Sequence, residues 1–84
     1  MMEVFNLRRS TRKNKKYMAD VKLRGEMYKN VHFGDARYQH YKDMTPLKLY
    51  SHLDHKDWDR KVKFYQRHNL NNGPAAMLSK EFLW

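Results

Sequence analysis

Two runs of alternating apolar and polar residues flank a glycine between residues 17 and 33, and this pattern restricts the fold more than any other feature of the sequence. A period of two is that of a β-strand with one buried face. Arg24-Gly25-Glu26 separates the runs, and Gly34-Asp35 ends the second one. We therefore expect a β-hairpin with a short glycine-containing turn. The residues expected on its apolar positions are Tyr17, Ala19, Val21, Leu23, Met27, Val31 and Phe33.

Two short helical signals follow the hairpin. Residues 35–43 carry Tyr38 and Tyr41 three positions apart, a spacing typical of a helical turn. Thr45-Pro46 then combines a favoured N-cap residue with a proline suited to the first helical position. The sequence therefore predicts a short helix over residues 46–53.

The main predicted helix covers residues 55–68. Asp54 is its expected N-cap, and Asp57 three positions later resembles the acidic member of a capping box. The helical period of 3.6 residues places two stripes on nearly opposite faces. The stripe expected to face the core is Trp58, Val62 and Tyr65, and the stripe expected to face outward is Lys56, Arg60, Lys63 and Arg67.

These elements predict an α+β fold, in which a β-hairpin packs against two or three short helices. With 84 residues, of which 14% are aromatic, the rings would supply most of a small core, and a surface site is more realistic than a deep cavity. Asn69–Gly73 has the composition of a loop, and Ser79 is a candidate cap for a last helical turn. The closing Phe82-Leu83-Trp84 is expected to dock into the core.

Basic residues are concentrated near the N-terminus and in the main predicted helix. Eighteen Lys and Arg against nine Asp and Glu give a formal net charge of +9. Residues 1–16 hold six of these cations and one acid, and such a run of like charge repels itself. We expect residues 1–16 to be a disordered basic arm and residues 17–84 to form one small α+β domain.

This charge excess attracts phosphate polymers at long range. We therefore predict non-enzymatic binding of nucleic acid, with DNA favoured over RNA, mainly through phosphate contacts and with little sequence preference. The predicted contact residues are Arg8, Arg9, Arg12, Lys13, Lys15, Lys16, Lys56, Arg60, Lys63 and Arg67.

Two other kinds of site are weighed against this interpretation. His52, Asp54, His55 and Asp57 could hold a divalent ion, which a nuclease would use to activate water, but Asp54 and Asp57 already have a sufficient role as caps. A second possibility is a platform for stacking bases, but a chain this small needs these rings for its core; the residues are His32, Phe33, Tyr38, His40 and Tyr41. We expect no metal, cofactor, small-molecule substrate or enzymatic activity. The sequence also predicts no membrane span and no signal peptide.

Three clusters give the chain a family resemblance. They are residues 31–35 (VHFGD) with Tyr38 and Tyr41, residues 54–68 from Asp54-His55-Lys56-Asp57 to Arg67-His68, and residues 78–84 (LSKEFLW). Together with Lys15-Lys16-Tyr17, this order resembles an uncharacterised family of short basic proteins from large DNA viruses, the giant viruses and their relatives. The likeness covers about residues 10–84, and Ala75-Ala76-Met77 departs from the bulkier aromatics of the family.

The resemblance implies a viral protein with a place in the virion, present in the host cytoplasm or nucleus during infection. It brings no activity and no catalytic residues. It also supports an alternative function, that of a minor capsid or cement protein. In that role the basic residues would bind acidic surfaces of larger viral capsid proteins.

Overall fold

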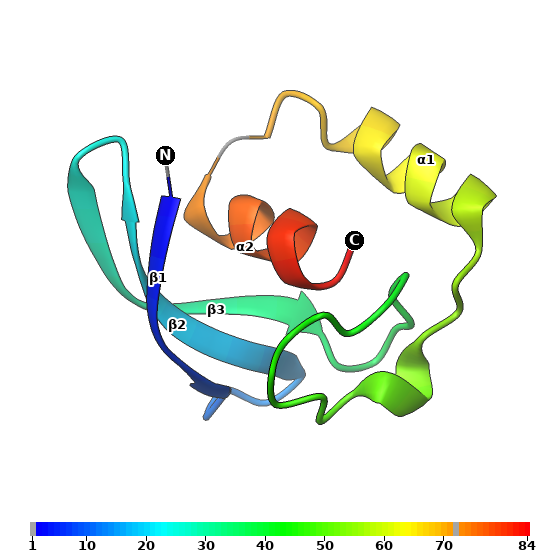
Figure 1. Cartoon of the computed structure of the whole chain (residues 1–84), viewed down its shortest axis with the longest axis horizontal. Coiled ribbons are helices and arrows are strands. Elements are labelled where there is room, and N and C mark those ends of the chain that lie inside the picture. The colour runs from blue at the N-terminus through cyan, green and yellow to red at the C-terminus, as the bar shows by residue number, and fades with distance from the viewer. Residues whose placement is uncertain (1, 72) are drawn as a thin grey trace.

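The computed structural model describes residues 2–71 and 73–84 and confirms the α+β fold (Figure 1). Within these residues the sheet has three antiparallel strands in the order β1-β2-β3. Two α-helices and one short 3-10 helix complete the described part of the chain. The elements are β1 (Met2–Arg9), β2 (Lys15–Leu23), β3 (Glu26–Asp35), η1 (Ser51–Leu53), α1 (Trp58–Arg67) and α2 (Pro74–Phe82).

Strands β2 and β3 confirm the predicted hairpin. Leu23 pairs with Glu26, so the turn consists of Arg24 and Gly25 alone. Both turn residues have positive φ, 52° and 81°, as a two-residue turn matched to the twist of the strands requires. The apolar face of β2 is buried as its alternation predicts.

The prediction of a free N-terminal arm is wrong, because Met2–Arg9 is strand β1 and pairs with β2. The alternation of this segment lets Met2 and Val4 pack against the core, and Leu7 joins them beyond the irregularity in the strand. Backbone hydrogen bonding and this apolar contact outweigh the repulsion between the cations. The arginines also find partners, since Arg8 donates to Asn30 Oδ1 (2.7 Å) and Arg9 lies over the Tyr50 ring.

Asp20 ties the three strands together at their irregular points. Its carboxylate accepts from Asn6 Nδ2 on β1 (3.0 Å) and from the backbone N–H of Asn30 on β3 (2.9 Å). Both asparagines have positive φ, 56° and 52°, a conformation that Asn tolerates better than most residues. The register of β1 shifts between Phe5 and Arg8, so the alternation is interrupted there without losing the pairing.

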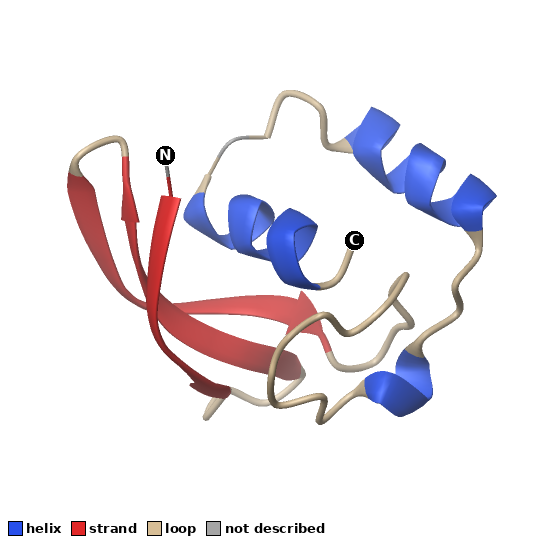
Figure 2. Ribbon diagram, viewed as in Figure 1, coloured by secondary structure: helices blue, strands red, loops and turns tan. Residues whose placement is uncertain are grey.

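The core lies between the sheet and α2. Tyr17, Ala19 and Val21 of β2 and Phe33 of β3 are buried together with Leu78 of α2. Figure 2 shows α2 next to the sheet and α1 farther out. As predicted, the C-terminal residues dock into the core, where Leu83 is buried and Phe82 and Trp84 pack around it. Ser79 does not begin a turn, because α2 starts earlier, with Gly73 as its N-cap and Pro74 in the first turn.

The predicted helix over residues 46–53 is wrong, and only its last turn, η1, is helical. The backbone N–H groups that a helix would use internally bind a buried network instead. Leu49 N donates to the hydroxyl of Tyr17 (2.9 Å), and Tyr50 N donates to Asp43 Oδ2 (3.0 Å). Thr45 is buried as part of the same network, where its hydroxyl donates to Asp43 Oδ1 (2.6 Å). Residues 35–43 likewise form turns and a bridge rather than a helix.

Candidate functional site

A basic cavity of about 560 Å³ lies between α1, the end of the hairpin and the C-terminal residues. Strand β2 contributes Lys15 and Lys16 to its wall, and α1 contributes Arg60, Lys63 and Arg67. Among the described residues that line it, Asp35 alone carries a side-chain carboxylate. The remaining lining residues are Gly34, Tyr38, Gln39, Phe64, His68, Ser79, Leu83 and Trp84.

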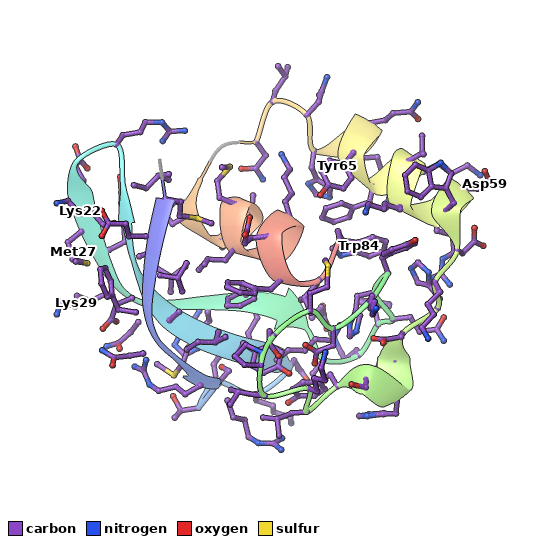
Figure 3. All side chains as sticks on the ribbon, viewed as in Figure 1. Lys22, Met27, Lys29, Asp59, Tyr65 and Trp84 are labelled. Carbon is purple, nitrogen blue, oxygen red and sulfur yellow. The ribbon has the colours of Figure 1, made fainter. Side chains whose placement is uncertain are left out.

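The position of α1 depends on an aromatic contact with the C-terminus. The rings of Phe64 and Trp84 stack in parallel, with centroids 4.3 Å apart and planes 4° apart. The ring of His68 lies on Phe64 at 4.4 Å, and Lys80 Nζ donates to the carbonyl of His68 (2.8 Å). Figure 3 shows Tyr65 and Trp84 in the space between α1 and α2, and the Tyr65 hydroxyl donates to the carbonyl of Lys80 (3.2 Å).

The predicted orientation of this helix is therefore wrong. Trp58 and Val62, expected in the core, are 63% and 38% exposed, and Tyr65 of the same stripe is also exposed. Phe64 makes the stacking contact with Trp84 in their place. The turn toward the C-terminal residues brings Arg60, Lys63 and Arg67 to the cavity wall, so three of the four cations predicted to face away from the core face the cavity.

The start of α1 also differs from the prediction. Asp57, not Asp54, is the N-cap, and its carboxylate accepts from the backbone N–H groups of Asp59 and Arg60. Asp54 is occupied elsewhere, because it accepts from His40 Nε2 (2.6 Å) and from the backbone N–H of Asp43 (2.8 Å). Within the described residues, no group of three or more His, Cys, Asp or Glu is arranged to hold a metal ion.

Lys16 is a buried cation of the cavity wall, with 2% of its surface exposed. Its Nζ donates to the carbonyl of Tyr38 (2.9 Å) and to His40 Nδ1 (2.8 Å). Because Nδ1 accepts, the Nε2 of a neutral His40 carries the proton and donates to Asp54. Burial lowers the pKa of Lys16 to about 8, although nearby carboxylates oppose this. Burial, and then the charge of Lys16, lower the pKa of His40.

Tyr38 lies at the cavity, and 64% of the residue's surface is exposed. Its backbone is held on both sides, since its N–H donates to the carbonyl of Asp35 (3.2 Å) and its carbonyl accepts from Lys16. The guanidinium of Arg37 lies 5.6 Å from the ring centroid. Arg37 is itself fixed by two hydrogen bonds to Asp35 (2.9 and 3.0 Å), which hold the pKa of that carboxyl at about 2. Asp35 is therefore neutralised by Arg37.

Five predicted contact residues thus line one cavity: Lys15, Lys16, Arg60, Lys63 and Arg67. The other five lie outside its lining. Arg8 and Arg9 belong to β1, Arg12 and Lys13 are exposed in the connection from β1 to β2, and Lys56 is exposed before α1. The contribution of Gln39 was not predicted, and Tyr38 was expected in the core rather than at a site, because their loop approaches α1 only in the folded chain. The hydrogen bond from Arg60 to Gln39 (2.9 Å) marks that approach.

The cavity is suited to binding an anion. Among the described residues, neither Lys63 nor Arg67 has a carboxylate within ion-pair distance, so like charges converge there without compensation. A phosphate between these residues would relieve their repulsion and accept charge-assisted hydrogen bonds. The outer side of α1 differs, with an open groove of about 390 Å³ lined by Trp58, Lys61, Val62, Tyr65, Gln66 and Asn69. None of the helices in the described ranges has the length and apolarity to cross a membrane.

The part of the chain that contains the hairpin and its cavity residues matches a known family model. Residues 5–46 match the family model described as "Family of unknown function (DUF5754)". No curated protein and no solved structure matches the chain. The matched segment includes β1 from Phe5 onward, all of β2 and β3, and the cavity residues from Lys15 to Gln39. It also includes Tyr17, Asp43 and Thr45 of the buried network, whereas α1 and α2 lie beyond it. Because the match covers half of the 84 residues, the chain belongs to this family of unknown function, DUF5754.

Proposed function

We propose that the protein is a non-enzymatic nucleic-acid-binding protein that holds phosphates in the cavity between α1 and the hairpin. The observation that carries this proposal is the convergence of five cations from two separate segments on one cavity. Phosphate contacts from Lys and Arg supply most of the sequence-independent affinity for nucleic acids. The resemblance to short basic proteins of large DNA viruses extends the proposal to a component of the virion.

A salt titration with two charge-matched variants tests this function. Lys63→Gln with Arg67→Gln removes two cavity cations. Lys22→Gln with Lys29→Gln removes two exposed cations at the far end of the sheet, where Figure 3 shows them pointing away from α1. Both double variants lower the net charge equally, so any difference in their DNA affinity reflects where the removed cations lie.

We expect the cavity variant to bind a DNA oligonucleotide more weakly than the wild type. The slope of log K against log salt should decrease by about 0.7 to 0.9 for each phosphate that the variant no longer neutralises. The control variant should retain most of the wild-type affinity and most of the wild-type salt dependence. Absence of binding at low salt would overturn the proposal, and equal weakening in the two variants would show that net charge alone is responsible.

A second candidate function is that of a minor capsid or cement protein bound to an acidic protein surface. The observation that favours it is the exposed apolar face of α1, where Trp58 and Val62 border the outer groove. Lys61 adds a cation to this face, with its Nζ 4.4 Å from the centroid of the Tyr41 ring and 5.3 Å from that of Trp58. Cross-linking of intact particles would separate the two functions, since this candidate requires cross-links from α1 to a capsid protein.

A further inference from the structure

We infer that the basic cavity takes an unpaired nucleic-acid strand, with phosphates among its cations and a base stacked on the Tyr38 ring. This inference rests on the proposed function and narrows its ligand from nucleic acid in general to single strands. Three observations support it: the shape of the cavity, the exposure of Tyr38, and the packing of the other cavity rings against one another.

The shape of the site favours a flexible strand. The cations line the walls of a cavity of about 560 Å³ in a molecule whose principal extents are 33 × 27 × 21 Å. A duplex presents its phosphates on a stiff convex surface, and proteins meet it with a projecting helix or ribbon. A single strand can bend so that one phosphate enters between Lys15 of β2 and Lys63 of α1, which are on different walls of the cavity.

Tyr38 supplies a stacking surface beside the cations. Exposed aromatic rings next to a basic groove are how proteins bind single strands without sequence choice, because every base has a π-face. The residue is 64% exposed, and its backbone is held by hydrogen bonds to Lys16 and Asp35. Arg37 is held by Asp35 near this ring, so a cation is also available to a stacked base.

The other aromatic rings of the cavity are already engaged. Phe64 and Trp84 stack on each other, and His68 lies against Phe64. Trp84 also contacts the ring of His55, with centroids 5.1 Å apart. These contacts hold α1 in place. Among the described residues that line the cavity, the ring left to accept a base is therefore that of Tyr38.

The test compares one strand in two forms, a fluorescent oligo-dT and the same oligo-dT paired with oligo-dA, at matched low salt. We expect the single strand to bind at least tenfold more tightly than the duplex. Tyr38→Ala should weaken single-strand binding by about fivefold or more, the range for removal of one stacked base, and leave duplex binding unchanged. Tyr38→Phe should retain the affinity. Trp58→Ala is the control, because it removes a ring that is equally exposed on the outer face of α1.

The outcomes separate this inference from the proposed function. If the duplex binds as tightly as the single strand and the removal of Lys63 and Arg67 weakens both, the single-strand inference fails and the phosphate-binding function stands. If single strands bind but Tyr38→Ala has no effect, the stacking on Tyr38 is overturned. If neither form binds at low salt, both proposals fail.

Discussion

Phe64 and Trp84 lie face to face, 4.3 Å between ring centroids, and this contact joins the middle of α1 to the C-terminal residue. Polar contacts from Arg60 to Gln39 and from Tyr65 to Lys80 add to it, whereas the outer face of α1 is exposed along Trp58 and Val62. The placement of the cations on α1 therefore depends strongly on this stacked pair, which the hydrogen bonds of Tyr65 and Lys80 support. Removal of this pair should release the helix without unfolding the sheet, where the core lies.

Trp84→Ala should accordingly increase the rate of amide hydrogen exchange across residues 58–67 while the exchange of β2 and β3 changes little. The free energy of unfolding should fall by about 1–3 kcal/mol, less than for a fully buried ring, because Trp84 is partly exposed. Trp58→Ala is the comparison: it removes a mostly exposed ring that touches Tyr41 at the start of the helix, and it should change both quantities less. Equal effects of the two substitutions would contradict the anchoring role of Trp84.

Gly34→Ala tests the close approach between β3 and the C-terminal segment. An added Cβ would lie 2.7 Å from Leu83 Cδ1 and 3.1 Å from Lys16 Cδ, and both of those residues are buried. Backbone strain at φ +77° adds to this clash. We expect denaturant unfolding to show a decrease in stability of about 2–4 kcal/mol, the sum of left-handed strain and overpacking.

Gly25→Ala provides the comparison for that measurement. Gly25 has a similar φ of +81°, but open space surrounds its Cβ position. Gly25→Ala should therefore lower the stability only through backbone strain, by about 1–2 kcal/mol. A decrease at Gly34 no larger than that at Gly25 would mean that Leu83 and Lys16 move aside without penalty.

Local patterns in the sequence were sufficient for the hairpin, because its alternation and its glycine turn are properties of adjacent residues. They were insufficient for the N-terminal segment, because its cluster of cations predicts disorder and the alternation of Met2 and Val4 is too short to indicate a strand. Strand β1 is stabilised by pairing with β2, and the bulge between Phe5 and Arg8 interrupts the period that would have indicated it.

The candidate site was predicted only in part for a related reason. The stripe of Arg60, Lys63 and Arg67 is visible in the helical period, but the direction that it faces is not. That direction depends on the pairing of Phe64 with Trp84, two residues that are far apart in the sequence. Similarly, Thr45-Pro46 carries a valid helix signal that Asp43 and Tyr17 override by binding the backbone that follows.

Tyr17→Phe should show how much that buried network contributes. The Tyr17 hydroxyl donates to Asp43 Oδ2 and accepts from the backbone N–H of Leu49, so its removal takes one hydrogen bond from each of these groups. The backbone N–H of Leu49 loses its partner, whereas Asp43 Oδ2 keeps the hydrogen bond from Tyr50 N, so the free energy of unfolding should fall by about 1–3 kcal/mol. Amide exchange should rise at Leu49 and Tyr50, which donate into the network. Tyr38→Phe removes an exposed hydroxyl and should be neutral, and exchange at Leu49 that stays slow in Tyr17→Phe would argue against the network.

Stability should also depend on pH in the alkaline range, through two adjacent residues of β2 with opposite effects. Burial lowers the pKa of Lys16 from 10.5 to about 8, so between these values the unfolded chain holds a proton that the folded chain has released. The free energy of unfolding therefore rises with pH across this window. For Tyr17, burial and then the hydrogen bond to Asp43 raise the pKa from 10.0 to about 12. Above pH 10 the folded chain keeps a proton that the unfolded chain releases, and stability falls.

Denaturant titrations from about pH 7 to 11.5 on the wild type, Lys16→Met and Tyr17→Phe would resolve these two contributions. The other lysines are common to all three proteins. The difference in stability between the wild type and each variant, plotted against pH, therefore isolates the contribution of Lys16 or of Tyr17. Relative to the wild type, Lys16→Met should lack the rise above pH 8, since methionine occupies the buried position without a titrating amine. Tyr17→Phe should keep that rise and lack the decline above pH 10. A wild-type curve that falls steadily from pH 8, or a Lys16→Met curve that parallels it, would contradict the assignment of the rise to Lys16.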